Sequence, residues 1–214
     1  MKYIVMCGGK YDGWETPRQL IEINGEPIIA RTVRLLKEAG AEDIYISAND
    51  KRFAPYAPLL EHTNTFQGYV KSGGGTWVEA FYPMEEPACY LMGDVVFSPE
   101  AVMQIVNKDT DSIDFFASAP PFDNRYIKPW AEPFAFKVTD QTTFRNAINA
   151  VKELEEAGLF YRRPIAWELW QVIKETPLNV ITENYTVIND YTCDIDKPED
   201  VRKIEQIMRG IRNE

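Results

Sequence analysis

The 214-residue chain is 45% hydrophobic and 26% charged, the composition of a soluble globular protein with one sizeable core. Its 33 acidic and 23 basic side chains give a formal net charge of -10, which disfavours both nucleic acid and an anionic membrane as partners. The single histidine, His62, excludes a multi-histidine zinc site, so any metal ion must rest on carboxylates.

The N-terminal part of the chain predicts one βαβ unit. The apolar run 3–7 ends in a glycine pair, as a buried parallel strand followed by a tight loop does. After an Asn-Gly turn at 24–25, apolar residues at near-helical spacing predict a helix over 27–40, from a proline to a glycine. A second strand is expected over 43–47. This order of elements is typical of the start of a doubly wound sheet.

The rest of the chain continues the alternation of helices and strands. Helices are expected over 75–84, 99–106, 141–157, 164–174 and 198–211, and strands over 89–92, 113–119, 134–138 and 179–188. The predicted fold class is therefore α/β: a single domain over residues 1–214, with three α/β/α layers around a mostly parallel, doubly wound, Rossmann-like sheet. Segment 120–133 is long for a structureless loop and is predicted to be a functional lid.

The cysteines and the apolar runs indicate a cellular location. Cys7, Cys89 and Cys193 are far apart and lie in or beside strand-like runs, which predicts buried, reduced thiols. The first strand is interrupted by glycines too early to be a secretory signal, and no later stretch approaches the roughly 20 apolar residues of a membrane span. We therefore expect a cytoplasmic protein without a membrane partner.

The loop after the first strand predicts an anion site. Gly8 and Gly9 follow the buried strand directly, so backbone N–H groups can approach an anionic ligand closely. Lys10 and Arg18 can add charge-assisted hydrogen bonds to phosphate oxygens. The loop matches neither the P-loop nor the dinucleotide-binding glycine pattern. A plain turn formed by two glycines is the alternative interpretation.

Two acidic motifs predict a metal site. Asp94 stands just beyond the carboxyl end of a buried strand, where open α/β sheets bind ligands and where a carboxylate can hold Mg²⁺ against phosphate oxygens. Strand alternation places Asp194 and Asp196 on one face, with Ile195 toward the core. The alternatives are structural, with Asp94 as the cap of the following helix and Asp196 as the cap of the last helix.

Several of these motifs together resemble a known family. The Gly-Gly loop, the Pro-Arg pair, the segment 23–29 and the strand-Gly-Asp motif are similar to the GT-A-like nucleotidyltransferases, which make activated sugars and alcohols and include the molybdenum-cofactor nucleotidyltransferases. Residues 194–200 resemble that family's closing Asp-x-Asp-x-Pro-Glu-Asp motif. The chain departs from the family's Gly-x-Gly-x-Arg loop, reading Lys-Tyr-Asp-Gly-Trp at 10–14, and it has Arg18 in place of the usual lysine.

The resemblance implies a role for each candidate residue. Gly8 and Gly9 would hold a triphosphate, with Arg18 neutralising phosphate and Lys10 compensating for the missing loop arginine. Asp94 and Asp196 would bind Mg²⁺, with Asp194 as a second ligand or water-mediated partner. The glycine run that contains Gly74 and Gly75 would border the nucleobase, although three glycines are equally typical of a mobile loop. Cations are expected on one flank of the site and carboxylates on the other.

The resemblance also implies an activity. We expect transfer of a nucleoside monophosphate group from an NTP, with CTP slightly favoured, to a sugar, polyol or choline phosphate, releasing pyrophosphate. Segment 120–133 would then be an acceptor-side lid, and a homodimer is one possible assembly. Trp167 and Trp170 fit core packing better than an aromatic box for a choline-like cation. The alternatives are a GT-A glycosyltransferase and a non-catalytic nucleotide-binding module on the same fold.

Overall fold

The central sheet has seven strands in the order β10-β8-β9-β6-β1-β4-β5. The computed structural model describes residues 1–8, 14–62, 76–118, 131–178 and 184–211. The strands are β1 (Lys2–Met6), β4 (Ile44–Ser47), β5 (Leu59–Leu60), β6 (Ala88–Met92), β8 (Ile113–Ser118), β9 (Pro133–Val138) and β10 (Thr186–Ile188). Four neighbouring pairs are parallel, and the two pairs that include β9 are antiparallel. The predicted mostly parallel, doubly wound sheet is confirmed.

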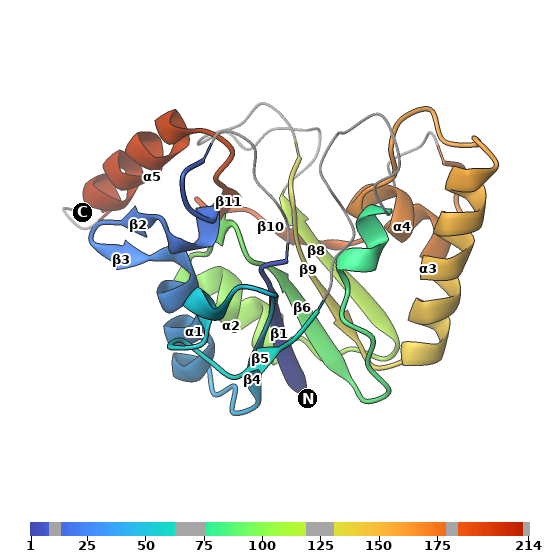
Figure 1. The fold of residues 1–214 in the computed structure, drawn as a ribbon, viewed down its shortest axis with the longest axis horizontal. Coiled ribbons are helices and arrows are strands. Elements are labelled where there is room, and N and C mark those ends of the chain that lie inside the picture. Colours follow the sequence, from blue (N-terminus) through green and yellow to red (C-terminus); the bar gives the residue numbers. More distant parts are fainter. Residues whose placement is uncertain (9–13, 63–75, 119–130, 179–183, 212–214) are drawn as a thin grey trace.

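Helices cover both faces of this sheet. The helices are α1 (Ile28–Glu38), α2 (Pro99–Asn107), α3 (Gln141–Glu156), α4 (Ala166–Ile173) and α5 (Pro198–Ile211), with the short 3-10 helices η1 (Arg18–Leu20), η2 (Lys51–Phe53) and η3 (Trp77–Ala80). Figure 1 shows α1 and α2 on one side of the sheet and α3 and α4 on the other, which confirms the three-layer α/β/α arrangement. None of the helices in the described part of the chain is long and apolar enough to cross a membrane.

The middle strands owe their apolar sequences to burial on both faces. All five residues of β6 are buried, and so are four of the five residues of β1. Helices cover both sides of these strands, so neither strand has a solvent face that would select polar residues at alternate positions. Cys7, Cys89 and Cys193 are buried and free, which confirms the predicted thiols. Burial raises the pKa of Cys89 to about 12, so its thiol stays protonated at neutral pH.

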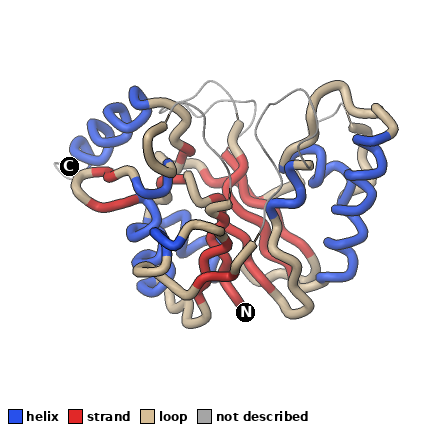
Figure 2. The backbone as a smooth tube through the Cα atoms, in the orientation of Figure 1, coloured by secondary structure: helices blue, strands red, loops and turns tan. Residues whose placement is uncertain are grey.

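A second, smaller apolar cluster lies beside the main core. The hairpin of β2 (Glu22–Ile23) and β3 (Glu26–Pro27), the antiparallel pair of β7 (Val95–Val96) and β11 (Cys193–Asp194), and α5 enclose it. Its buried residues are Ile23, Ile28, Val96, Cys193, Ile195, Ile204 and Met208. In Figure 2 the hairpin and α5 lie together at one end of the molecule. We call the antiparallel pair of β7 and β11 the ribbon, because the candidate carboxylates lie in it or directly beside it.

The prediction of a helix over 75–84 is wrong for the residues of this segment that the structure describes. Only residues 77–80 form a 3-10 turn, and the chain is extended at Phe81, with ψ at 118°. The ring of Phe81 makes edge-to-face contacts with Tyr90, Phe136 and Phe144 on the sheet and α3. This aromatic packing and the nearby Pro83, which disfavours helical backbone at the residue before it, overcome the helical spacing of the apolar residues.

Candidate functional site

The ribbon brings the two acidic motifs together. Its ladder pairs Val96 with Cys193 and Val95 with Asp194. The backbone N–H of Ile195 donates to the carbonyl of Asp94 at 3.0 Å, which extends the ladder by one more pair. Two segments about a hundred residues apart therefore place their aspartates at one end of a short antiparallel pair.

Arg18 lies between two of these aspartates. Its Nη2 is 3.0 Å from Oδ2 of Asp94, and its Nη1 is 2.8 Å from Oδ1 of Asp196. The same Nη1 donates to the carbonyl of Ile195 at 2.8 Å. One planar guanidinium thus joins the loop after β1, the loop after β6 and the segment before α5, through N–H groups whose directions are fixed by the plane.

This position of Arg18 differs from the expected separation of charges. The cation was expected on the flank opposite the carboxylates, and instead it bridges Asp94 and Asp196. The physical reason is electrostatic. Asp94 and Asp196 contact the same guanidinium, and a positive group between two carboxylates lowers their mutual repulsion.

Ser98, and not Asp94, caps the helix that follows the first acidic motif. Ser98 caps α2, where its hydroxyl accepts the backbone N–H of Ala101 at 2.9 Å. Before α5, the carboxylate of Asp200 accepts the backbone N–H groups of Asp196 and Lys197 at 3.1 and 3.0 Å. Asp94 is therefore not required as the cap of α2.

The environment of Asp94 makes its negative charge costly. Burial is the main cause that raises the pKa of this carboxyl, and the charges of Asp194 and Asp196 raise it further, while Arg18 acts in the opposite direction. The three carboxylates are therefore close enough to interact electrostatically, and Arg18 supplies one positive charge to the group. Such an arrangement favours a further cation when the aspartates are ionised.

The donor set fits Mg²⁺. Carboxylate oxygens are the hard ligands that this ion prefers, and proteins commonly bind it through one or two carboxylates together with substrate phosphates and water. Within the residues that the structure describes, no group of three or more His, Cys, Asp or Glu side chains is arranged to hold a metal ion by itself. The pair Asp94 and Asp196 therefore fits a metal that shares its coordination with a substrate.

The candidate phosphate loop begins next to Asp94. β1 and β6 are parallel neighbours with Met6 opposite Met92, so Gly8 and Asp94 each stand two residues beyond a paired position. They therefore lie at the same end of adjacent strands, whose spacing is about 4.8 Å. The other proposed ligand-binding residues of the glycine segments lie outside the described residues: Gly9, Lys10, Gly74 and Gly75.

Gly93 has a packing requirement that the sequence motif does not reveal. A Cβ atom at this position would collide with the backbone carbonyl of Met6 and would lie 2.8 Å from Sγ of Cys7. The backbone N–H of Gly93 donates to the same Met6 carbonyl at 3.1 Å. Only glycine permits this close approach of β6 to β1, and the approach fixes where Asp94 begins.

We predict that Gly93→Ala damages both stability and the site. The added methyl group meets backbone atoms, so the strand ends must separate, at about 1–3 kcal/mol of unfolding free energy. Asp94 moves with them, and activity is expected to fall about 10- to 100-fold. Gly210→Ala is the matched control, because a Cβ in that part of α5 meets nothing within 4 Å. Thermal unfolding and a pyrophosphate assay on both variants check this, and equal behaviour would contradict it.

Sequence reasoning missed two residues that border the carboxylates. The Trp14 indole N–H donates to the carbonyl of Asp196 at 3.3 Å. The buried carboxylate of Glu132 accepts the backbone N–H of Asp194 at 3.2 Å, and Glu132 is 1% exposed. Glu132 lies at the end of the expected lid 120–133, most of which is outside the described residues. A charged residue directly before the apolar run of β9 was the available signal.

The tryptophans of α4 are core residues. Trp167 and Trp170 are buried, and both contact the ring of Phe115 in β8. The core interpretation of this pair is therefore confirmed. Just before this helix, Arg162 pairs with Glu168 at 2.8 Å and Arg163 with Glu155 at 3.9 Å.

Comparison with protein families identifies the family of the chain. The model of the MobA-like NTP transferase domain matches residues 3–165, more than half of the chain. The chain belongs to this family. The match to the MobA-like NTP transferase domain includes Arg18 and Asp94 and ends before Asp194 and Asp196. In this MobA-like NTP transferase the carboxylates therefore come from both inside and beyond the matched region.

Solved structures share the fold of this MobA-like NTP transferase. The CTP:phosphocholine cytidylyltransferase of Streptococcus pneumoniae matches with a TM-score of 0.52 and 16% sequence identity, over 97% of this chain and 98% of that one. At this identity the likeness shows a common fold. A search of curated proteins finds no match.

Proposed function

We propose that this chain is an Mg²⁺-dependent nucleotidyltransferase that transfers a nucleoside monophosphate group from an NTP to a phosphorylated small molecule. The observation that carries the proposal is the contact of one guanidinium with two carboxylates, Arg18 with Asp94 and Asp196, at the carboxyl end of the central strands. Ligands of open α/β sheets bind at this edge. A triphosphate requires cations, and a divalent ion requires carboxylates, and the site presents both.

The reaction is a displacement at phosphorus. An oxygen of the acceptor's phosphate forms a bond to the α-phosphorus of the NTP, and the bond from that phosphorus to the bridging oxygen of the β-phosphate breaks. Pyrophosphate leaves with the bonding electrons. The acceptor phosphate is already ionised at neutral pH, so the protein is not required to remove a proton.

The side chains contribute alignment and charge neutralisation. Arg18 would bind oxygens of the triphosphate and draw charge from the departing pyrophosphate, with Lys10 as a second cation. Asp94 and Asp196 would hold Mg²⁺, with Asp194 beside them. When bound, Mg²⁺ supplies charge neutralisation at the α-phosphate and orients the incoming oxygen. Holding both reactants together is worth about 7–11 kcal/mol of the barrier.

CTP is the proposed nucleotide, and a sugar, polyol or choline phosphate is the proposed acceptor. Two observations support this choice. The Asp-x-Asp pair at 194–196 resembles that of cytidylyltransferases, and a structure of the same fold is a CTP:phosphocholine cytidylyltransferase. Fold likeness alone is a weak guide to substrate, so the experiment must include all four nucleotides.

A pyrophosphate-release assay tests the proposal. We expect release when the protein is mixed with Mg²⁺, one NTP and a phosphorylated acceptor, fastest with CTP, and none when EDTA replaces the metal. Glu85→Gln, which removes one partner of an exposed ion pair with Arg145, is expected to be fully active and controls for mutagenesis. A protein that binds Mg²⁺ and NTP yet releases no pyrophosphate with any acceptor would be a nucleotide-binding module instead.

A further inference from the structure

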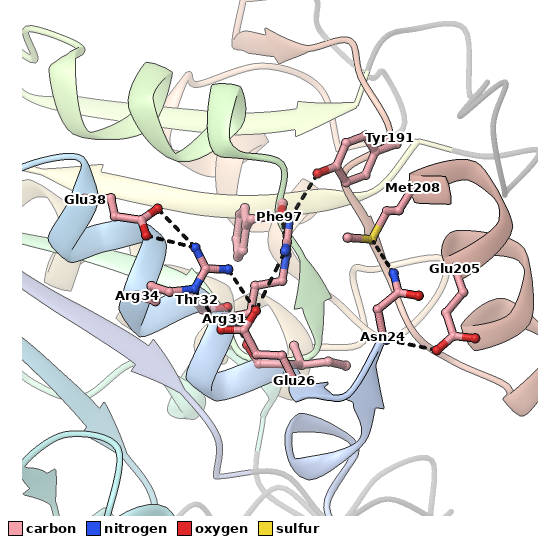
Figure 3. A network of polar contacts seen from close by, with 11 residues as sticks. Asn24, Glu26, Arg31, Thr32, Arg34, Glu38, Phe97, Tyr191, Glu205 and Met208 are labelled. Atoms are coloured by element: carbon pink, nitrogen blue, oxygen red, sulfur yellow. Dashed lines mark hydrogen bonds and ion pairs between the residues drawn. The ribbon is translucent and has the colours of Figure 1, made fainter. Parts of the chain in front are cut away.

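A buried arginine holds the end of the ribbon that lies away from the carboxylates. Arg31 is on α1 and is 7% exposed. Its Nε donates to the backbone carbonyl of Phe97 at 3.1 Å, and its Nη2 donates to the hydroxyl of Tyr191 at 3.0 Å. Figure 3 shows both contacts leaving the same guanidinium. Phe97 directly follows β7, and Tyr191 stands two residues before β11, so Arg31 contacts the segments beside both strands of the ribbon.

The ribbon connects these contacts to the candidate site. Asp94 is three residues from Phe97 along one strand, about 10 Å at the usual rise of a strand. The ladder pairs between them are Val96 with Cys193 and Val95 with Asp194. Because a two-pair ladder has few hydrogen bonds of its own, its orientation depends on what holds its ends. Arg18 contacts one end and Arg31 the other.

Two other hydrogen bonds at the Arg31 end join the two strands to each other. The backbone N–H of Ser98 donates to the hydroxyl of Thr192 at 3.0 Å, and the hydroxyl of Ser98 donates to Asp190 at 2.5 Å. These bonds set which residues face one another. Arg31 ties the pair to α1, which packs on the central sheet, so it fixes the ribbon relative to β1 and β6.

The chemistry of Arg31 suits this task. A planar fork donates in two fixed directions at once, which suits two acceptors on separate segments. Burying the charge of Arg31 costs free energy unless its N–H donors are satisfied. The carboxylate of Glu26, 3.9 Å from Nη1, offsets part of this cost. Truncating Arg31 would leave both the Phe97 carbonyl and the Tyr191 hydroxyl without this donor.

Arg34, one turn further along α1, is a natural comparison. Figure 3 shows it bound to Glu26 and Glu38 and to neither ribbon strand. Those contacts are 2.8 and 3.0 Å long, and all three side chains are partly exposed. An exposed ion pair of this kind contributes at most about 1 kcal/mol to stability. Comparing variants of the two arginines therefore distinguishes the effect of a positive charge on α1 from the effect of hydrogen bonds to the ribbon.

We propose that Arg31 is a positioning residue that holds the ribbon so that Asp94 and Asp196 face a common point. The inference rests on the proposed function, because that function gives the two carboxylates their task. Arg31 makes no contact with the reacting groups and acts through the strands. Its loss displaces the carboxylates, and a displacement of about 1 Å can lower turnover about 100-fold.

The test compares Arg31→Met with Arg34→Met. Amide hydrogen exchange is measured first, and the backbone N–H of Ile195, bonded to Asp94, is expected to exchange at least about 10-fold faster in Arg31→Met while β1 and β6 amides are unchanged. In the pyrophosphate assay kcat is expected to fall about 100-fold with KM for NTP within about threefold. Arg34→Met is expected to match the wild type in both measurements.

Tyr191→Phe guards against a variant that does not fold. It removes one hydroxyl and keeps the ring, so faster exchange at Ile195 and a smaller fall in kcat, about threefold to tenfold, are expected. Unchanged Ile195 exchange in both Arg31→Met and Tyr191→Phe would overturn the positioning role. A wild-type protein that lacks activity with every NTP and acceptor would overturn the proposed function, and the exchange data would still decide the role of Arg31.

Discussion

Asp94→Asn is expected to lower the rate of pyrophosphate release at least about 1,000-fold, equivalent to about 4 kcal/mol in the activation barrier. The amide keeps the size of the carboxylate and loses the charge that would hold Mg²⁺. Arg18 would retain its contacts with Asp196 and with the Ile195 carbonyl, both at 2.8 Å. The local structure is therefore preserved while the proposed metal site is not.

The same variant is expected to be at least as stable as the wild type at neutral pH. Burial, followed by the charges of Asp194 and Asp196, raises the pKa of Asp94 above its unfolded value. The folded state then binds more protons than the unfolded state between the two pKa values, so stability falls as pH rises through that window. Above the window the wild-type protein bears the full cost of an ionised carboxylate, and the asparagine variant does not.

Two measurements on one preparation check this prediction. Thermal unfolding is measured for the wild type and Asp94→Asn from acidic to neutral pH, and the stability of the wild type relative to the variant should fall as pH rises. The pyrophosphate assay should show loss of turnover in the variant. Glu85→Gln removes a carboxylate that is exposed and paired with Arg145, and it should change neither. Full activity of Asp94→Asn would contradict the assignment of Asp94 as a metal ligand.

The main sheet and its helices could be predicted because local patterns determine them. The run that became β1, the helix α1 between Pro27 and Gly40, and the run that became β6 each carry a long apolar pattern with a clear stop. Gly40, at φ 91°, occupies the left-handed conformation that ends a helix most easily in glycine. Patterns of this length are the ones in which local preference and tertiary structure agree.

The pairing of the ribbon strands could not be predicted, and the functional role of the aspartates beside it remains a prediction. β7 and β11 are two residues each, too short for any period to be visible, and their partners are nearly a hundred residues apart. Tertiary packing of the second apolar cluster, with Ile195 at its centre, decides their pairing. Asp94 and Asp196 were therefore found as separate motifs, and their common contact with Arg18 emerged only from the fold.

The burial of Arg31 could not be predicted from the sequence either. Arg31 lies among the apolar residues of α1, where a charge is ordinarily read as part of the solvated face. It is buried because Phe97 and Tyr191 supply acceptors that its own helix does not. The sequence contains no local sign of those acceptors, which lie 66 and 160 residues further along the chain.

Arg18→Met is expected to separate binding of the cation from binding of the nucleotide. In the structure the Arg18 guanidinium occupies the space between Asp94 and Asp196, so a divalent ion arriving alone must displace it. Triphosphate oxygens offer Arg18 another partner and free the carboxylates for the ion. Mg²⁺ and NTP should therefore bind the wild type cooperatively, with a coupling of about 5- to 150-fold.

Removing the guanidinium should strengthen binding of the divalent ion and weaken binding of NTP. Arg18→Met is expected to bind Mn²⁺ or Mg²⁺ alone about tenfold more tightly than the wild type, because no internal cation competes for the carboxylates. It should bind NTP more weakly and lose most of the coupling, since the charge-assisted bonds to phosphate are gone. Turnover is expected to fall about 1,000-fold, a loss typical of removing a charge that stabilises departing phosphate.

Calorimetric titration checks this without relying on activity. The divalent ion is titrated with and without NTP into the wild type, Arg18→Met and the control Arg145→Met, whose arginine pairs with exposed Glu85. A wild type that binds the ion equally well with and without NTP would contradict the coupling. Unchanged ion and NTP affinities in Arg18→Met would remove Arg18 from the site altogether. If Arg18→Met binds the ion more tightly and the nucleotide more weakly than the wild type does, one arginine must bind the carboxylates in the absence of NTP and the triphosphate in its presence.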